Sequence, residues 1–149
     1  MNQVDPNDLE ACVVEATYGL FEQVIDTPIE RIAPRKVTGP GFKGLVQVPT
    51  SPPMTVHVQM PTPLARMAAA KVFNRPDGAI SDEDCSDLIG EMTNIVAGSL
   101  NGMFADATGL SLPTTHQTDH PVPDGVHQLW FCNQDHAFAV WWDVVPQMN

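Results

Sequence analysis

The longest periodic segment of the chain, residues 82–104, constrains the fold most, because it predicts one long helix with two different faces. Ser81 followed by Asp84 resembles a capping box and marks its start, and residues 106–109 should end it. At 100° per residue, mostly apolar residues share a face that should meet a core: Leu88, Met92, Ile95, Val96, Ser99 and Met103. Polar and small residues share a face that should meet solvent: Asp87, Glu91, Asn94, Gly98, Asn101 and Ala105.

The composition of this solvent-facing stripe is unusual for a helix. Asparagine is a poor helix former, and an interior glycine costs about 1 kcal/mol relative to alanine. Asn94 and Gly98 nevertheless stand one turn apart, where neither would contribute to packing. Simple solvation explains most polar helix faces, but helix stability alone would favour Lys, Glu or Ala here. We therefore interpret the stripe as a surface that another molecule approaches closely.

The first part of the chain predicts a helix followed by a hairpin. Asp5-Pro6 is a helix start, and apolar residues then recur at helical spacing as far as Asp26-Thr27-Pro28. A strand is expected over 42–48, and a second over 54–60, where apolar and polar residues alternate. His57 should lie on the wetter face of that second strand.

The remaining segments complete the order of elements. Thr62-Pro63 should cap a helix over 64–73, which precedes the long helix. After it we expect three strands separated by a loop over 115–126; the strands are 110–114, 127–132 and 137–145. This order predicts an α+β domain with an antiparallel-rich sheet and helices packed on it. At 149 residues, the chain should form a single domain over 1–149.

Charge and cysteine content exclude several classes of function. The net charge is −11, which argues against a free-standing nucleic-acid or anionic-membrane binder. We expect no membrane span and no secretory signal. The three cysteines are widely separated and fit free thiols in a reducing cytoplasm. All seven basic residues lie within 31–75, where they either neutralise the acidic flanks or steer an acidic partner.

No metal or cofactor site is expected in the chain. His116 and His120 have i, i+4 spacing, but Pro113 and Pro121 on either side disfavour a helix. A third ligand at useful spacing is lacking. The chain also lacks a glycine-rich phosphate loop followed by Lys-Ser/Thr.

One constellation resembles a known family. Asp87-x3-Glu91-x2-Asn94, followed by Gly98 and then by Ser111-x-Pro113, resembles the signature of the chemotaxis phosphatases CheC and CheX, which are related to the flagellar switch phosphatase FliY. The element order over residues 40–145 is similar as well. The resemblance implies the same α+β fold.

The resemblance also implies an activity. Such a phosphatase removes the phosphoryl group from the aspartate of a CheY-like response regulator. Phosphoryl transfer passes through a loose transition state, so catalysis depends mainly on positioning and charge stabilisation. Asn94 would position the attacking water through its carboxamide, and Glu91 would pair with the regulator's active-site lysine. The Mg²⁺ would be bound by the regulator, not by this chain.

The same comparison implies secondary roles and an oligomeric state. Asp87 and Asn101 would contact the partner, Gly98 would allow its backbone to approach, and Pro113 would fix a chain turn below the site. CheC-type members carry two motif helices, whereas here Ala11-x3-Glu15-x2-Tyr18 lacks the carboxamide. One motif per chain resembles CheX, whose members form homodimers.

Two other interpretations of the stripe remain open at this point. The chain could be a non-catalytic receiver-binding adaptor or motor-switch component with the same fold. Alternatively, it could be a structural dimer whose polar stripe is only solvated.

Overall fold

A six-stranded antiparallel sheet forms the centre of the computed structural model, which describes residues 4–36, 39–50, 52–104, 109–134 and 136–144. The strands follow the order β1-β5-β6-β3-β2-β4, and every neighbouring pair is antiparallel. Their bounds are Glu30–Ile32 (β1), Gly41–Val48 (β2), Met54–Pro61 (β3), Thr114–Thr118 (β4), His127–Asn133 (β5) and His136–Val144 (β6). The predicted α+β class is confirmed.

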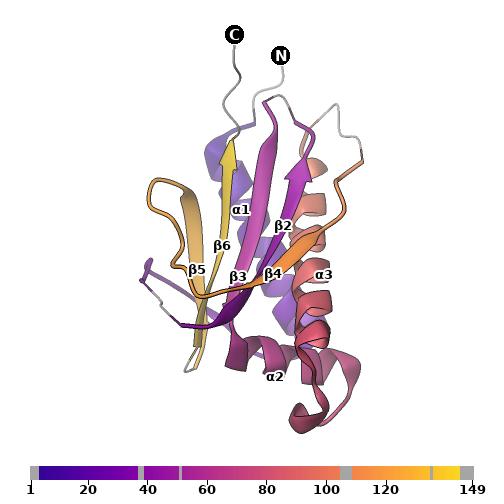
Figure 1. The fold of residues 1–149 in the computed structure, drawn as a ribbon. Helices are drawn as coiled ribbons and strands as arrows, with labels where there is room; N and C mark the ends of the chain where they lie inside the picture. The colour runs from indigo at the N-terminus through magenta and orange to yellow at the C-terminus, as the bar shows by residue number, and fades with distance from the viewer. Residues whose placement is uncertain (1–3, 37–38, 51, 105–108, 135, 145–149) are drawn as a thin grey trace.

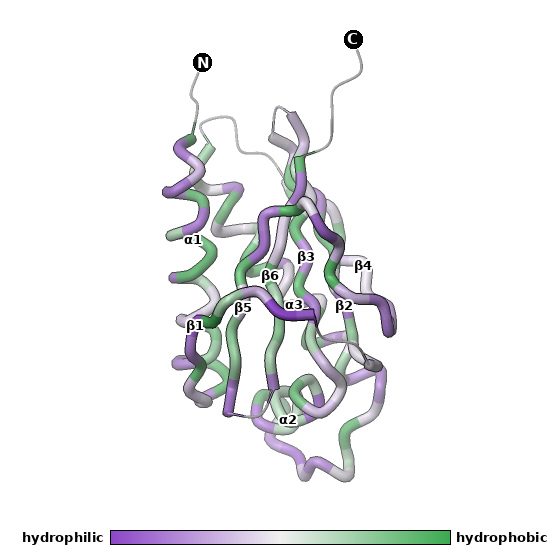
Figure 2. The backbone as a smooth tube through the Cα atoms, turned by 90° about the vertical axis from the view of Figure 1, so that its left-hand side faces the viewer, coloured by the Kyte–Doolittle hydropathy of each residue, from purple (hydrophilic) through white to green (hydrophobic). Residues whose placement is uncertain are grey.

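Helices cover one face of this sheet and one of its ends. Helix α1 (Pro6–Gly19) continues into a π-helical turn, Leu20–Ile25, and stops at Asp26, whose φ of 56° is left-handed. Figure 1 shows α1 and α3 (Asp82–Asn101) behind the sheet, and α2 (Thr62–Phe73) across its lower end. Figure 2 gives the edge-on view, with α1 on one side of the strands. No helix among the described residues is both long enough and apolar enough to cross a membrane.

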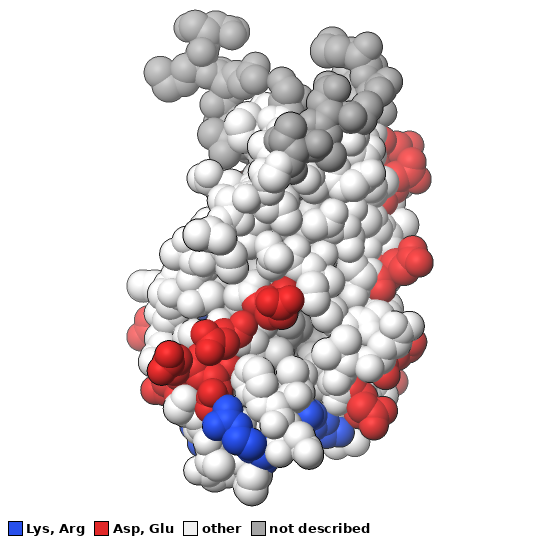
Figure 3. Space-filling model, turned by 90° about the vertical axis from the view of Figure 1, so that its right-hand side faces the viewer, with Lys and Arg blue, Asp and Glu red and all other residues white. Residues whose placement is uncertain are grey.

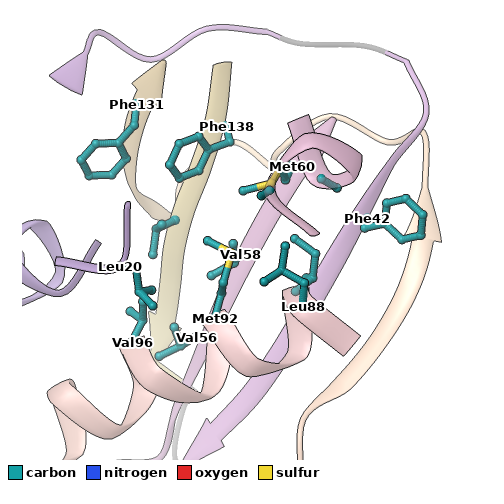
Figure 4. Packing of buried hydrophobic residues seen from close by; sticks show 14 of the residues in the cluster. Leu20, Phe42, Val56, Val58, Met60, Leu88, Met92, Val96, Phe131 and Phe138 are labelled. Carbon is teal, nitrogen blue, oxygen red and sulfur yellow. The ribbon is translucent and has the colours of Figure 1, made fainter. Parts of the chain in front are cut away.

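The main core lies between the sheet and the helices. Apolar side chains at alternate positions of β3 point toward α3, which is the expected result of period-two alternation. In Figure 4 the labelled side chains from α3 and β3 face one another: Leu88, Met92 and Val96 against Val56, Val58 and Met60. All six are at most 4% exposed, so the contact between α3 and β3 excludes water.

The opposite face of the sheet is also partly covered. The segment that follows β4, residues 119–126, crosses this face to reach β5 (Figure 1). Val122 and Val126 pack there against a second, smaller apolar cluster formed by Trp130, Ala139 and Trp141.

Burial of that face makes one prediction wrong. His57 is 5% exposed rather than solvated, and its ring stacks on Trp141 with 3.5 Å between the centroids. Its Nε2 lies 3.8 Å from Asp143 Oδ1. Burial, assisted by the positive charges of Lys43 and His116, lowers the pKa of His57 to about 3. Sequence alternation alone did not show that the ring of Trp141 would stack on His57.

Two strands differ from the predictions for related reasons. Strand β1 is only three residues long and pairs with β5, so it is too short to show a periodic pattern. Strand β4 lies at 114–118 rather than 110–114, within the stretch that was expected to be a loop. Its sequence, Thr-Thr-His-Gln-Thr, has no apolar alternation because it forms the edge of the sheet beside β2.

The start of α2 also differs slightly from the prediction, because Pro61 rather than Thr62 is its N-cap residue.

Ion pairs within the chain account for part of the basic segment. Arg31 pairs with Glu10, and Arg75 Nη2 lies 2.7 Å from Asp84 Oδ1. A third, looser pair joins Arg66 to Asp77 at 3.9 Å. These contacts favour neutralisation of acidic flanks over steering of a partner. Cys12, Cys85 and Cys132 are free thiols, as expected.

Candidate functional site

Helix α3 sits unusually close to β2 because Gly44 has no side chain. A Cβ at Gly44 would lie 2.2 Å from Thr93 Oγ1 and 3.0 Å from the carbonyl oxygen of Ile89. Thr93 is fully buried, and its hydroxyl donates a hydrogen bond of 2.7 Å to that same carbonyl. The rotation of α3 about its own axis is therefore fixed by a close contact. A lone glycine inside a predicted strand is a signal for such an approach, although it does not say which element approaches.

The start of α3 is fixed by the predicted capping box. Ser81 Oγ accepts from the Asp84 backbone N–H at 3.1 Å, and Asp84 Oδ2 accepts from the Ser81 N–H at 2.9 Å. The backbone hydrogen bond from Ser81 lowers the pKa of Asp84, and the hydrogen bond from Arg75 lowers it further. Both contacts define where the first turn begins and hence where each later residue points.

The polar stripe of α3 is exposed over most of its length. Asp87, Glu91 and Gly98 are exposed, and Asn94 is half-buried. Glu91 and Asn94 are three residues apart, so they lie on the same side of the helix, one turn from each other. Figure 3, which faces the side where α3 lies, shows acidic side chains gathered toward the end where the helix begins. The middle of that face above them is uncharged.

The two faces of α3 differ from the helical-wheel prediction at their margins. Asn101 is 9% exposed, so its predicted position on the solvent-facing stripe is wrong. Ile95, expected in the core, is 37% exposed, and Ser99 is half-buried. Because α3 contacts α1 and α2 as well as the sheet and β4, its buried residues span an arc of about 220°, which reaches Asn101 on one side and stops short of Ile95 on the other. Ala105 and residues 106–108 lie outside the described residues.

An extended segment, residues 110–113, lines one side of the stripe. The Gln47 N–H donates to Ser111 Oγ at 2.8 Å, and the Ser111 N–H donates to the Gln47 carbonyl at 3.2 Å. A Cβ at Gly90 would lie 3.6 Å from Pro113 Cβ. Pro113 therefore packs beside the residue that precedes Glu91, which is a structural position next to the stripe.

Helix α1 carries a counterpart of the motif without the amide. Its buried Thr17 donates to the Val13 carbonyl at 2.7 Å, as Thr93 does to a carbonyl in α3. Tyr18 occupies the place that Asn94 has in α3. Its hydroxyl accepts from the Arg31 N–H at 3.1 Å, and its ring packs edge-on to Phe131. Tyr18 is therefore committed to contacts within the chain.

The cavities lined by described residues lie away from the stripe. A cavity of about 250 Å³ lies near the junction of β3 and α2, lined by residues that include Pro40, Met60 and Phe138, and neither Glu91 nor Asn94 lines it. Among the described residues, no three His, Cys, Asp or Glu side chains are grouped to hold a metal ion. An exposed acid beside a half-buried amide on a convex helix suits a reaction whose reacting group is carried by a second protein.

Comparison with known proteins identifies relatives of this architecture. The family described as chemotaxis phosphatase CheX matches residues 42–131. No curated protein sequence matches the chain.

Solved structures share the fold at low sequence identity. Chemotaxis protein CheX from Vibrio vulnificus superposes with a TM-score of 0.74 at 16% identity, covering 96% of this chain and 100% of that one. A CheC-like superfamily protein from Shewanella sp. PV-4 gives 0.70 at 15% identity, covering 96% and 99%. A chain of the CheX–CheY–BeF₃–Mg²⁺ complex from Borrelia burgdorferi gives 0.69 at 17% identity, covering 97% and 100%.

Proposed function

The chain belongs to the CheX family of chemotaxis phosphatases, and we propose that it hydrolyses the aspartyl phosphate of a CheY-like response regulator. The observation that carries this proposal is the placement of the exposed Glu91 and the half-buried Asn94 on one side of a helix whose rotation is fixed by Gly44. The complex of a CheX with CheY, BeF₃ and Mg²⁺, which has a similar fold, supports a receiver domain as the partner.

Asn94 is proposed to position the attacking water. Its carboxamide oxygen accepts a hydrogen bond from the water, which holds the water in line with the bond to be broken. The water oxygen forms a bond to phosphorus while the bond from phosphorus to the aspartyl oxygen breaks. The products are the free carboxylate of the regulator and inorganic phosphate, which keeps both protons of the water. Because the transition state is loose, Asn94 need not act as a base.

Glu91 is proposed to hold the regulator in register. As an exposed carboxylate one turn before Asn94, it can pair with a lysine at the regulator's active site. The exposed Asp87 would contact the rim of the partner, and Gly98 would admit its backbone. We assign no contact role to Asn101 because it is buried. The Mg²⁺ is expected on the regulator.

One amide-bearing helix per chain is the basis for a proposed homodimer with two separate sites. Tyr18 in α1 takes the place of the amide and binds β1, so the first helix supplies no second site. We expect the reaction in the cytoplasm, which agrees with the three free thiols. Light scattering of the purified protein tests the dimer.

The decay of a phosphorylated receiver from the same genome tests the function. We expect wild-type protein to accelerate the decay and Glu91→Lys to remove most of that acceleration by reversing the proposed pair. Glu83→Gln is the matched control, because Glu83 is an exposed acid in the first turn of α3, two turns before Glu91. Binding without acceleration would instead identify a non-catalytic adaptor or motor-switch component. Neither binding nor acceleration would leave the stripe as a solvated face.

A further inference from the structure

Leu112 is the most exposed large apolar side chain among the described residues, at 88%. Single exposed apolar residues are common on protein surfaces, so exposure alone says little. Leu112 differs from such residues in two ways: its backbone is held on both sides, and it lies beside Asn94.

The backbone on both sides of Leu112 is fixed. Ser111 exchanges two hydrogen bonds with Gln47 at the end of β2, through its hydroxyl and its N–H. On the other side, Pro113 has a restricted φ and packs beside Gly90. Thr114 then begins β4 and pairs with Leu45. A side chain presented from such a support loses little backbone entropy on binding, which favours a role as an anchor.

The segment runs antiparallel to α3 along the edge of the stripe. A Cβ at Gly98 would lie 3.8 Å from Leu110 Cδ1, whereas Pro113 contacts Gly90. An extended chain advances about 3.3 Å per residue and a helix about 1.5 Å, so one residue of the segment spans about two residues of α3. Since Pro113 lies beside Gly90, Leu112 lies level with the next turn of α3, which contains Asn94.

A second apolar side chain lies on the other flank. At 100° per residue, Asn94 lies on the side of Glu91 that faces the 110–113 segment, and Ile95 lies on the opposite side. Ile95 is 37% exposed. The acid and the amide therefore stand between two exposed apolar side chains, one from the helix and one from the loop before β4.

We propose that Leu112, assisted by Ile95, is an anchor that selects the receiver domain through an apolar patch beside its phosphorylated aspartate. This inference rests on the proposed function. Apolar contacts around a polar centre exclude water from it, and hot spots in interfaces are commonly surrounded in this way. A receiver with a charged side chain opposite Leu112 would have to bury that charge without a partner, so such receivers are rejected.

Titration with a receiver activated by beryllofluoride and Mg²⁺ tests this proposal. We expect Leu112→Ala to weaken binding about tenfold, which corresponds to about 1.4 kcal/mol, and Leu112→Asp to weaken it more. The matched control is Val24→Asp, which changes an apolar residue that is 53% exposed in the π-helical turn after α1. It should keep the dissociation constant within twofold.

Kinetics separate anchoring from chemistry. Because Leu112 does not touch the phosphoryl group in this proposal, Leu112→Ala should raise KM about tenfold and leave kcat within twofold. Thermal melting should be unchanged, since the side chain is exposed.

The outcomes distinguish the two proposals. Equal affinity of wild type and Leu112→Ala, or no binding by wild type, overturns the anchor. If Leu112→Ala weakens binding but wild type does not accelerate the decay of the phosphorylated receiver, the anchor is supported and the phosphatase assignment is overturned.

Discussion

The close contact between β2 and α3 makes Gly44→Ala the most informative change in the scaffold. The added Cβ would lie 2.2 Å from Thr93 Oγ1, and atoms in real structures do not approach a Cβ below about 3.0 Å. Thr93 cannot turn away without breaking its 2.7 Å hydrogen bond to the carbonyl of Ile89, and that carbonyl is itself 3.0 Å from the new atom. The helix must therefore move away from the sheet.

The size of the effect follows from two opposing terms. Overpacking a core typically lowers the free energy of unfolding by about 1–3 kcal/mol, whereas replacing glycine by alanine inside a strand raises it by about 0.5–1 kcal/mol. With the backbone carbonyl of Ile89 among the clashing atoms, we expect a net loss of about 2 kcal/mol of unfolding free energy. A displaced α3 also moves Asn94, and a displacement of about 1 Å can cost 100-fold in rate.

A double-mutant cycle in urea denaturation measures the contact itself. Thr93→Ala removes the nearest clashing atom, so Gly44→Ala should cost about 1 kcal/mol less in that background than in wild type. Two results would contradict the close contact between Gly44 and α3. One is an equal cost of Gly44→Ala in both backgrounds, and the other is a Gly44→Ala protein as stable as wild type.

Two further predictions concern stability. Ser81→Ala removes the capping box of α3 and should lower the unfolding free energy by about 1 kcal/mol at neutral pH, measured by urea denaturation; an unchanged midpoint would contradict it. His57 has a pKa of about 3 when folded and an ordinary value of 6.5 when unfolded, so only the unfolded chain takes up a proton as pH falls from 6.5 toward 3. Over that window wild type should lose up to about 1.4 kcal/mol per pH unit relative to His57→Phe, and parallel stability curves for the two proteins would refute the buried neutral histidine.

The parts of the fold that sequence predicted are those with a local signal. The capping box and the apolar stripe marked α3, and period-two alternation marked β3. The parts it missed depend on contacts with distant segments. Three residues at Glu30–Ile32 become a strand only because β5 offers an edge, and the polar β4 only because β2 does.

The same distinction applies to the site. The exposure of Glu91 follows from helical spacing and was predicted, whereas Asn94 is half-buried rather than fully exposed. The burial of Asn101 depends on how many neighbours surround α3, which a helical wheel does not contain. Leu112 was not singled out, because its position beside Asn94 arises from the path of the 110–113 segment along the helix.

Asn94→Ala tests the central claim most directly when binding and decay are measured on the same receiver. The exposed stripe should still dock, so the dissociation constant for the beryllofluoride-activated receiver should stay within about threefold of wild type. Acceleration of phospho-receiver decay at saturation should fall by about 100-fold, because the water loses its positioning group. Full acceleration by Asn94→Ala would contradict the account.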